Sequence, residues 1–276
     1  MIVPEGARDS ATPLAVDTCG SGPAVVLLHG QPGSGGDWSR VVPLLSGDHR
    51  VIVPDRPGYG RTAGAATGFA GNAAAIAQLL DQLGEADAVL VGHSWAGGVA
   101  LAAAVQSPSL VRGLVLVASV RPGEQLGWVD RMLAARGIGD ALSATTIGAT
   151  GLVLRTRKVR ELVERRLNGR ARDVVRALEA VTGARTKAPV WRSFVSEQRR
   201  LFDELGELAP ALNTISVPTV VLSGGSDRIV PAPVGERLAA EIPGAVHKVI
   251  PGARHLLPID QPEVIAGAVR DVEGWA

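Results

Sequence analysis

The segment Gly92-His93-Ser94-Trp95-Ala96-Gly97 places a serine between an apolar run and an alanine-rich stretch. This is the context of a nucleophile elbow, a sharp strand-to-helix turn whose central residue is strained. Small residues two positions before and after the serine let strand and helix approach closely, and Gly92 and Ala96 meet that need. The turn also aims Ser94 along the N-terminus of the next helix, where free N–H groups stabilise negative charge. We therefore predict that Ser94 is a nucleophile.

A serine hydroxyl is a weak nucleophile near neutral pH and needs a base, for which the chain offers five histidines. Four are set aside because they close a strand turn, precede a strand, point away from Ser94 inside the elbow, or lie within the last strand: His29, His49, His93 and His247. His255 remains, on the loop between the last predicted strand and the last predicted helix. We predict that His255 is the general base.

The base needs a carboxylate on its second ring nitrogen to hold one tautomer. Asp227 fits this role because it follows the apolar run TVVLS in the turn GGSDRIVP. Its side chain and that of His255 are then expected at the carboxyl edge of one sheet, where open α/β folds place their sites. Asp260 and Asp130 are the reserve candidates.

Acyl transfer also requires hydrogen-bond donors for the oxyanion of the tetrahedral intermediate. The glycine-rich turn Leu28-His29-Gly30-Gln31-Pro32-Gly33 directly follows a predicted strand. We expect the backbone N–H groups of Gln31 and Trp95 to be the donors. A phosphate-binding loop is the rival interpretation of HGQPGSGG, but the chain has no G-x-x-x-x-G-K-S/T sequence.

Short apolar runs alternate with longer Ala- and Leu-rich stretches, which is typical of an α/β fold with a mostly parallel, doubly wound sheet covered by helices on both faces. The predicted strands are Ala24–Leu28, Arg50–Pro54, Ala88–Val91, Leu114–Ala118, Thr219–Ser223 and Val246–Ile250. The predicted helices are Gly71–Leu83, Ala96–Gln106, Val234–Glu241 and Pro262–Val272.

This alternation stops between residues 119 and 216, where apolar residues recur at helical spacing. We therefore expect an inserted helical cap at 119–216 on a core formed by 1–118 and 217–276. Its clearest helix begins at Pro189 and carries an apolar stripe with charges on the opposite face, the stripe being Trp191, Phe194, Val195, Leu201, Phe202 and Leu205. Aromatic residues of the cap either pack against the core or line a substrate pocket, and the pocket candidates are Trp128, Trp191 and Phe194.

The composition, with 46% hydrophobic residues, 20% charged residues and a net charge of +1, is globular and gives no nucleic-acid footprint. The single cysteine, Cys19, cannot form an intramolecular disulfide, which favours a reducing compartment. The first residues lack the basic region and following apolar region of a secretory signal peptide, so we expect the protein to be cytoplasmic. The apolar stretch from Ala86 to Val105 contains an aspartate, a histidine and several glycines, so we expect no membrane helix there.

Charge is unevenly divided along the chain. Residues 119–216 hold 17 Lys and Arg against 11 Asp and Glu, so the remainder is net negative. Opposite charges would attract the cap to the core. The functional alternative is an anionic substrate or an acidic carrier protein, to which the arginine-rich stretch from Arg155 to Arg160 would bind; a solvated helix face is the plainer interpretation of that stretch.

Taken together, HGQPG, DRPGYGRT, GHSWAG, GGSDRIVP and GARHLLP, in that order, resemble the α/β-hydrolase superfamily over nearly the whole chain outside the cap. The resemblance implies that Ser94 is the nucleophile, His255 the general base and then acid, and Asp227 its orienting group, with Gln31 and Trp95 as the oxyanion hole. It implies no metal and no organic cofactor. Ala96 stands where the family most often has glycine.

The resemblance also separates this chain from some relatives. Epoxide hydrolases and haloalkane dehalogenases use a carboxylate where this chain has Ser94, and the epoxide enzymes normally add cap tyrosines. The only tyrosine here is Tyr59, outside the cap, where we expect it to pack the loop that supports the site.

The expected function is therefore that of a serine hydrolase acting on an ester, thioester, lactone or related acyl bond of a small, largely apolar substrate. Because folds host changed functions, three alternatives stay open: a carbon–carbon bond hydrolase, a cyclase, lyase or acyl transferase without net water addition, and a small-molecule receptor with vestigial turnover.

Overall fold

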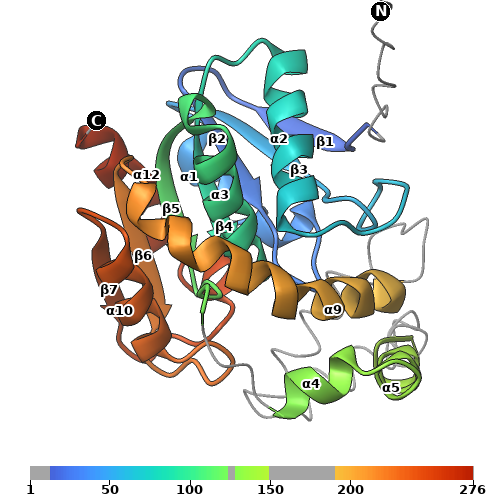
Figure 1. The fold of residues 1–276 in the computed structure, drawn as a ribbon. Helices are drawn as coiled ribbons and strands as arrows, with labels where there is room; N and C mark the ends of the chain where they lie inside the picture. Colours follow the sequence, from blue (N-terminus) through green and yellow to red (C-terminus); the bar gives the residue numbers. More distant parts are fainter. Residues whose placement is uncertain (1–12, 124–127, 149–189, 276) are drawn as a thin grey trace, which may run out of the picture.

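The computed structural model describes residues 13–123, 128–148 and 190–275, and the strands in these ranges form one seven-stranded sheet in the order β1-β3-β2-β4-β5-β6-β7 (Figure 1). The strands are β1 (Val16–Cys19), β2 (Ala24–Leu28), β3 (Arg50–Pro54), β4 (Ala88–His93), β5 (Val111–Val117), β6 (Thr219–Gly224) and β7 (Val246–Ile250). Neighbouring strands are parallel except β1 and β3, which are antiparallel. The predicted mostly parallel sheet is confirmed.

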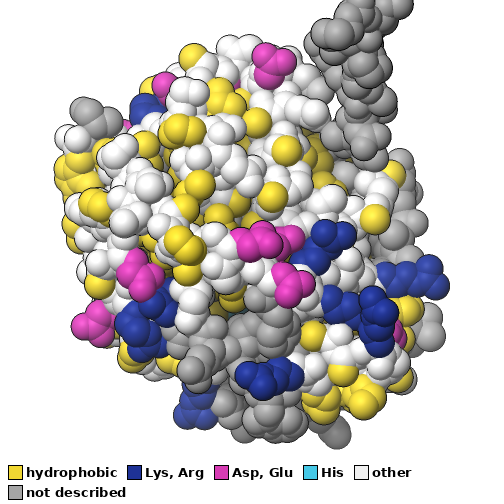
Figure 2. Space-filling view, in the orientation of Figure 1, with side chains coloured by type: hydrophobic (Ala, Val, Ile, Leu, Met, Phe, Trp, Pro, Cys, Tyr) yellow, Lys and Arg dark blue, Asp and Glu magenta, His cyan; other side chains and the backbone are white. Residues whose placement is uncertain are grey.

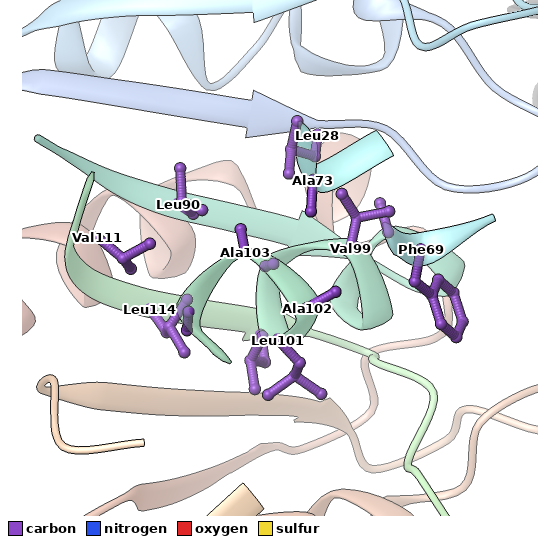
Figure 3. Close-up of a cluster of buried hydrophobic side chains, with 14 of the residues drawn as sticks. Leu28, Phe69, Ala73, Leu90, Val99, Leu101, Ala102, Ala103, Val111 and Leu114 are labelled. Atoms are coloured by element: carbon purple, nitrogen blue, oxygen red, sulfur yellow. The ribbon is translucent and has the colours of Figure 1, made fainter. Parts of the chain in front are cut away.

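Helices cover both faces of this sheet because alternate strand side chains point to opposite sides. Val26 and Leu28 of β2 pack toward α2 (Phe69–Leu83), α3 (Trp95–Gln106) and α10 (Ala232–Glu241). Val25 and Leu27 pack on the other side, toward α1 (Val42–Leu45), α11 (Leu257–Asp260) and α12 (Pro262–Gly274). Figure 3 shows Val99 of α3 among the apolar side chains that fill the space between this helix and the strands.

The elements follow the predicted pattern, with differences at the ends. Each predicted strand and helix is present, and α2 and α10 begin two residues before their predicted starts. The strand β1 was not predicted. Its sequence, VDTC, is exposed after the first residue and pairs on one side only, so it lacks the apolar run on which the prediction of the buried strands depends.

Between β5 and β6, the described residues form helices and connecting turns. They are α4 (Trp128–Ala134), α5 (Ile138–Ser143), the π-helix η3 (Ala144–Gly148), α9 (Val190–Leu208) and the 3₁₀ helix η4 (Ala209–Thr214). Figure 1 shows α9 crossing below α2 and α3, with α4 and α5 on its other side. Leu201, Leu205 and Leu208 anchor α9 in the same apolar cluster as α2 and α3.

Parts of the predicted cap fall beyond these helices. Pro189 and the stretch from Arg155 to Arg160 lie outside the described residues, and the division into core and cap stays a prediction. None of the helices in the described ranges is both long and apolar enough to cross a bilayer.

Candidate active site

Ser94 sits at the junction of β4 and α3 with a φ of 55°, a conformation that strains a residue with a side chain. Three backbone hydrogen bonds hold it there: its N–H donates to the carbonyl of Val117 at 2.8 Å, and its carbonyl accepts from the N–H groups of Gly97 and Val120 at 3.0 and 3.2 Å. A Cβ atom at Gly92 would lie 2.5 Å from the carbonyl oxygen of Ala96. Strand and helix therefore approach so closely that position 92 has room only for glycine.

The hydroxyl of Ser94 is the first member of a chain of side-chain hydrogen bonds. Its Oγ lies 3.0 Å from Nε2 of His255, and Nδ1 of His255 lies 2.8 Å from Oδ2 of Asp227. The other carboxylate oxygen of Asp227 accepts from the N–H groups of Ile229 and Val230 at 2.8 and 3.1 Å. With the carboxylate as acceptor, Nδ1 of His255 carries the proton, which leaves Nε2 to accept from the hydroxyl of Ser94.

These side chains meet because each follows or ends a parallel strand at one edge of the sheet. Ser94 follows β4, Asp227 follows β6, and His255 follows β7. The side chain of His255 keeps 13% of its exposure, whereas that of Asp227 keeps none. The imidazole is therefore accessible from solvent, whereas the side chain of the carboxylate is not.

The loop between β2 and η1 (Gly35–Trp38) passes directly beside Ser94. A Cβ atom at Gly30 would lie 3.1 Å from Cβ of Ser94. Gln31 follows Gly30, and no backbone hydrogen bond is made by its N–H within the described residues. Trp95 begins α3, where the first N–H groups of a helix lack intrahelical partners. Both amides therefore meet a requirement of the predicted oxyanion hole, and the role itself stays a prediction.

The buried ring of His29 connects this loop to the segment after β3. Nδ1 of its ring lies 2.9 Å from the carbonyl oxygen of Gly30, and its Nε2 accepts from the backbone N–H of Arg56 at 3.0 Å. Nδ1 therefore carries the ring proton and donates it to Gly30. Burial, with the charge of Arg56 adding to it, holds the pKa of His29 well below its ordinary value, so the ring remains neutral.

His93 contributes a contact that the sequence did not predict. Its Nε2 lies 2.9 Å from the carbonyl oxygen of His255, and the two ring centroids are 5.1 Å apart. Burial, followed by the neighbouring His255, lowers the pKa of His93 to about 3. A neutral His93 thus donates to the backbone of His255 and supports the loop that carries it.

The chain was compared with models of known protein families. A model of the Alpha/beta hydrolase family matches residues 25–268. The chain belongs to the alpha/beta hydrolase family. Among the described residues, no group of three or more His, Cys, Asp or Glu side chains could hold a metal ion.

Proteins with several different names are similar to the chain. The magnesium-chelatase 30 kDa subunit of Rhodobacter capsulatus is 29% identical, with 91% of this chain and 86% of that protein covered. The pimeloyl-[acyl-carrier protein] methyl ester esterase of Edwardsiella ictaluri is 30% identical, covering 91% and 94%. The solved structure of a thermophilic esterase from Thermogutta terrifontis has a TM-score of 0.69 at 27% identity, covering 96% of each chain. Haloalkane dehalogenases lie at similar identity.

The predicted pocket residues and reserve aspartates of this alpha/beta hydrolase are only partly described by the structure. Trp191 and Phe194 are half-buried on α9, and the guanidinium of Arg192 lies 5.3 Å from the ring centroid of Trp191. Trp128 begins α4, but its side chain and that of Asp130 lie outside the described part of the structure. Their assignment to a pocket stays a prediction. Asp260, the other reserve candidate, ends α11, whereas the carboxylate bonded to His255 is that of Asp227.

Proposed function

We propose that this alpha/beta hydrolase is a serine hydrolase that cleaves an ester, thioester, lactone or related acyl bond through a covalent ester on Ser94. The observation that carries the proposal is the unbroken chain from Oγ of Ser94 through His255 to the buried carboxylate of Asp227, at 3.0 and 2.8 Å. This arrangement supplies a nucleophile, a base in the required tautomer and a group that orients the base.

In the first half-reaction, Nε2 of His255 removes the hydroxyl proton as Oγ of Ser94 attacks the acyl carbon. The oxyanion that forms accepts hydrogen bonds from the N–H groups of Gln31 and Trp95. His255 then returns the proton to the leaving group, and an acyl ester remains on Ser94. Asp227 stabilises the imidazolium throughout without itself taking the proton.

In the second half-reaction, water replaces the leaving group. His255 takes a proton from the water, the resulting hydroxide attacks the acyl carbon, and the proton passes to Oγ as the acid departs. The only tyrosine, Tyr59, is buried and donates its hydroxyl to Glu197, so it is not free to protonate an opening epoxide ring. Serine at position 94 also lacks the carboxylate that haloalkane dehalogenases use.

The first test is the hydrolysis of an activated p-nitrophenyl ester by Ser94→Ala. We expect kcat to fall by about 10⁶-fold with the melting temperature nearly unchanged. Ser223→Ala is the matched control, because Ser223 also lies 3.0 Å from a histidine, His247, but sits inside strand β6. Unchanged turnover in folded Ser94→Ala would remove Ser94 from the mechanism.

Two further measurements separate this proposal from the alternatives within the family. Incorporation of one oxygen from ¹⁸O-labelled water into the acid product would establish net hydrolysis, whereas a cyclase, lyase or acyl transferase would incorporate none. Tight binding of a product-like compound with negligible turnover would indicate a receptor.

We propose a small, largely apolar acyl group as the substrate. The name of the Edwardsiella ictaluri relative specifies a carrier-bound methyl ester, which makes an acidic carrier protein the partner to test. A salt-sensitive preference for carrier-bound over free thioester would support this partner, and equal activity on both at low and high salt would exclude it.

A further inference from the structure

Glu197 is the one charged side chain of α9 that is fully buried. Figure 2 shows charged side chains gathered over the part of this face where α9 lies, and Arg192, Arg200, Asp203 and Glu207 are all exposed. The side chain of Glu197 has no exposure to solvent at all. Because burying a carboxylate is costly unless it is paired, its surroundings require an explanation.

The carboxylate of Glu197 meets two side chains of the segment that follows β3. Its Oε1 pairs with Nη1 of Arg56, and its Oε2 accepts the hydroxyl of Tyr59 at 2.6 Å. The guanidinium of Arg56 is also fully buried. Burial raises the pKa of Glu197, and the charge of Arg56 opposes that shift. An arginine stays protonated even when it is buried. Arg56 therefore depends on Glu197 for a negative charge in direct contact.

The opposite side of Arg56 reaches the loop beside the nucleophile. Its Nε donates to the carbonyl of His29 at 2.8 Å, and its Nη2 donates to the carbonyl of Gly30 at 3.0 Å. Its guanidinium carbon also lies 4.5 Å from the ring centroid of Trp95 and 4.7 Å from that of Tyr59. One buried cation thus contacts both segments that carry the predicted oxyanion donors.

The bond to Gly30 matters because of peptide geometry. The carbonyl of Gly30 and the N–H of Gln31 belong to the same planar peptide unit and point in opposite directions when it is trans. Arg56 and His29 both donate to that carbonyl, at 3.0 and 2.9 Å. Holding the oxygen on one side therefore fixes the direction of the Gln31 N–H on the other.

We propose that Arg56 and Glu197 are positioning residues, which together couple α9 to the orientation of the Gly30–Gln31 peptide and so to the oxyanion hole. Glu197 fixes the guanidinium, and the guanidinium fixes the peptide plane. The inference rests on the proposed function for its effect on catalysis. The coupling itself is a property of the fold and is measurable without turnover.

Other contacts dock α9 on the same region without reaching this peptide. Oγ of Ser193 donates to the carbonyl of Gly58 at 2.6 Å, and the carboxylate of Glu204 accepts from the N–H of Phe69. Glu204→Gln is therefore a matched control, since it alters a second carboxylate of α9 that contacts the core, one that is only partly buried. A general loosening of α9 would affect both variants, whereas the proposed coupling distinguishes Glu197 from Glu204.

The kinetic test compares Glu197→Gln, Glu204→Gln and the double variant Arg56→Met/Glu197→Leu on a p-nitrophenyl ester. The double variant replaces the buried pair with apolar groups, a change that folded proteins often tolerate. We expect kcat to fall by about 10²-fold in Glu197→Gln and in the double variant, with KM little changed, and to stay near wild type in Glu204→Gln. A double variant that is folded and has wild-type kcat would reduce the pair to a structural role and overturn the inference.

Hydrogen–deuterium exchange supplies the readout that does not need catalysis. We expect faster exchange in the peptide covering residues 29–36 in Glu197→Gln and in the double variant, and no change there in Glu204→Gln. Unchanged exchange in both Glu197 variants would overturn the inference even if the wild type hydrolyses esters.

If the wild type hydrolyses no ester, the proposed function fails, and the exchange result still decides whether α9 is coupled to this loop. Tyr59→Phe, which removes one bond to Glu197, is the milder variant should Glu197→Gln not fold, and the same local increase in exchange is then expected.

Discussion

Asp227 and Glu197 are both buried carboxylates with no side-chain exposure, yet they are held in different ways. Asp227 accepts two N–H groups of its own turn in addition to His255. Glu197 binds Arg56 and Tyr59, which lie 141 and 138 residues away in the chain. The first carboxylate is stabilised locally by a loop, whereas the second is stabilised only when α9 docks on the sheet. His255, the proposed base, is thus oriented by a self-contained turn, whereas the loop that carries Gln31, a proposed oxyanion donor, is held by an interaction between distant elements.

The largest expected effect tests the Asp227 side of this comparison. Asp227→Asn keeps the shape of the side chain but favours the wrong tautomer of His255. We expect kcat for ester hydrolysis to fall by about 10⁴-fold with little loss of stability, as measured by steady-state kinetics and thermal unfolding. A loss of less than about tenfold in folded protein would show that His255 does not depend on this carboxylate.

The next effect tests the Glu197 side, on stability. Glu197→Leu leaves the charge of Arg56 buried without a countercharge in contact, so we expect the free energy of unfolding to fall by about 3–5 kcal/mol. Chemical denaturation measures it, with exposed Glu207→Leu as the control on the same helix. A loss no larger than in the control would mean that the pair contributes no stability.

A third carboxylate, Asp37, sharpens the comparison because no cationic side chain among the described residues forms an ion pair with it. Its Oδ1 has no hydrogen-bond partner in the described structure, and burial raises its pKa to about 7. Between about pH 4 and 7, folded protein therefore keeps a proton that the unfolded chain releases, so Asp37 makes stability fall as pH rises.

Asp37→Asn should remove that slope. We expect the difference in unfolding free energy between this variant and the wild type to grow in favour of the variant by up to about 4 kcal/mol from pH 4 to 7. Denaturant unfolding at several pH values measures it. A difference that is constant across this range would contradict the raised pKa.

The smallest expected effect concerns the support of His255. His93→Leu removes the donor to the carbonyl of His255, a neutral hydrogen bond of 2.9 Å. We expect a loss of about 1 kcal/mol in unfolding free energy and a few-fold decrease in kcat. A loss as large as that in Asp227→Asn would place His93 among the reacting groups instead.

Much of the fold could be predicted from the sequence because the buried strands are continuous apolar runs. The strand β1 could not be predicted because an exposed edge strand has no such run. Ser94, Asp227 and His255 could be selected because each follows a predicted strand, and parallel strands bring their carboxyl ends to one edge. Which cap side chains face the site could not be predicted, because periodicity gives the buried face of a helix but not what it contacts.

The interaction of Arg56 with Glu197 was missed for a different reason. Charged residues of an amphipathic helix are normally assigned to the solvent face, and Glu197 was grouped with them. Its position nevertheless carried a signal, since it lies three residues after Phe194 and four before Leu201, on the apolar stripe itself. Arg56 belongs to the segment DRPGYGRT, and no sequence pattern indicates that its side chain turns toward Gly30.

The most direct test of the central claim is covalent labelling of Ser94 by a fluorophosphonate, followed by peptide mass spectrometry. We expect one label per chain, on Ser94, no label in Ser94→Ala, and much slower labelling in His255→Ala, because the hydroxyl reacts only when the imidazole accepts its proton. An unlabelled Ser94 in folded wild-type protein, or equal labelling rates with and without His255, would contradict the account.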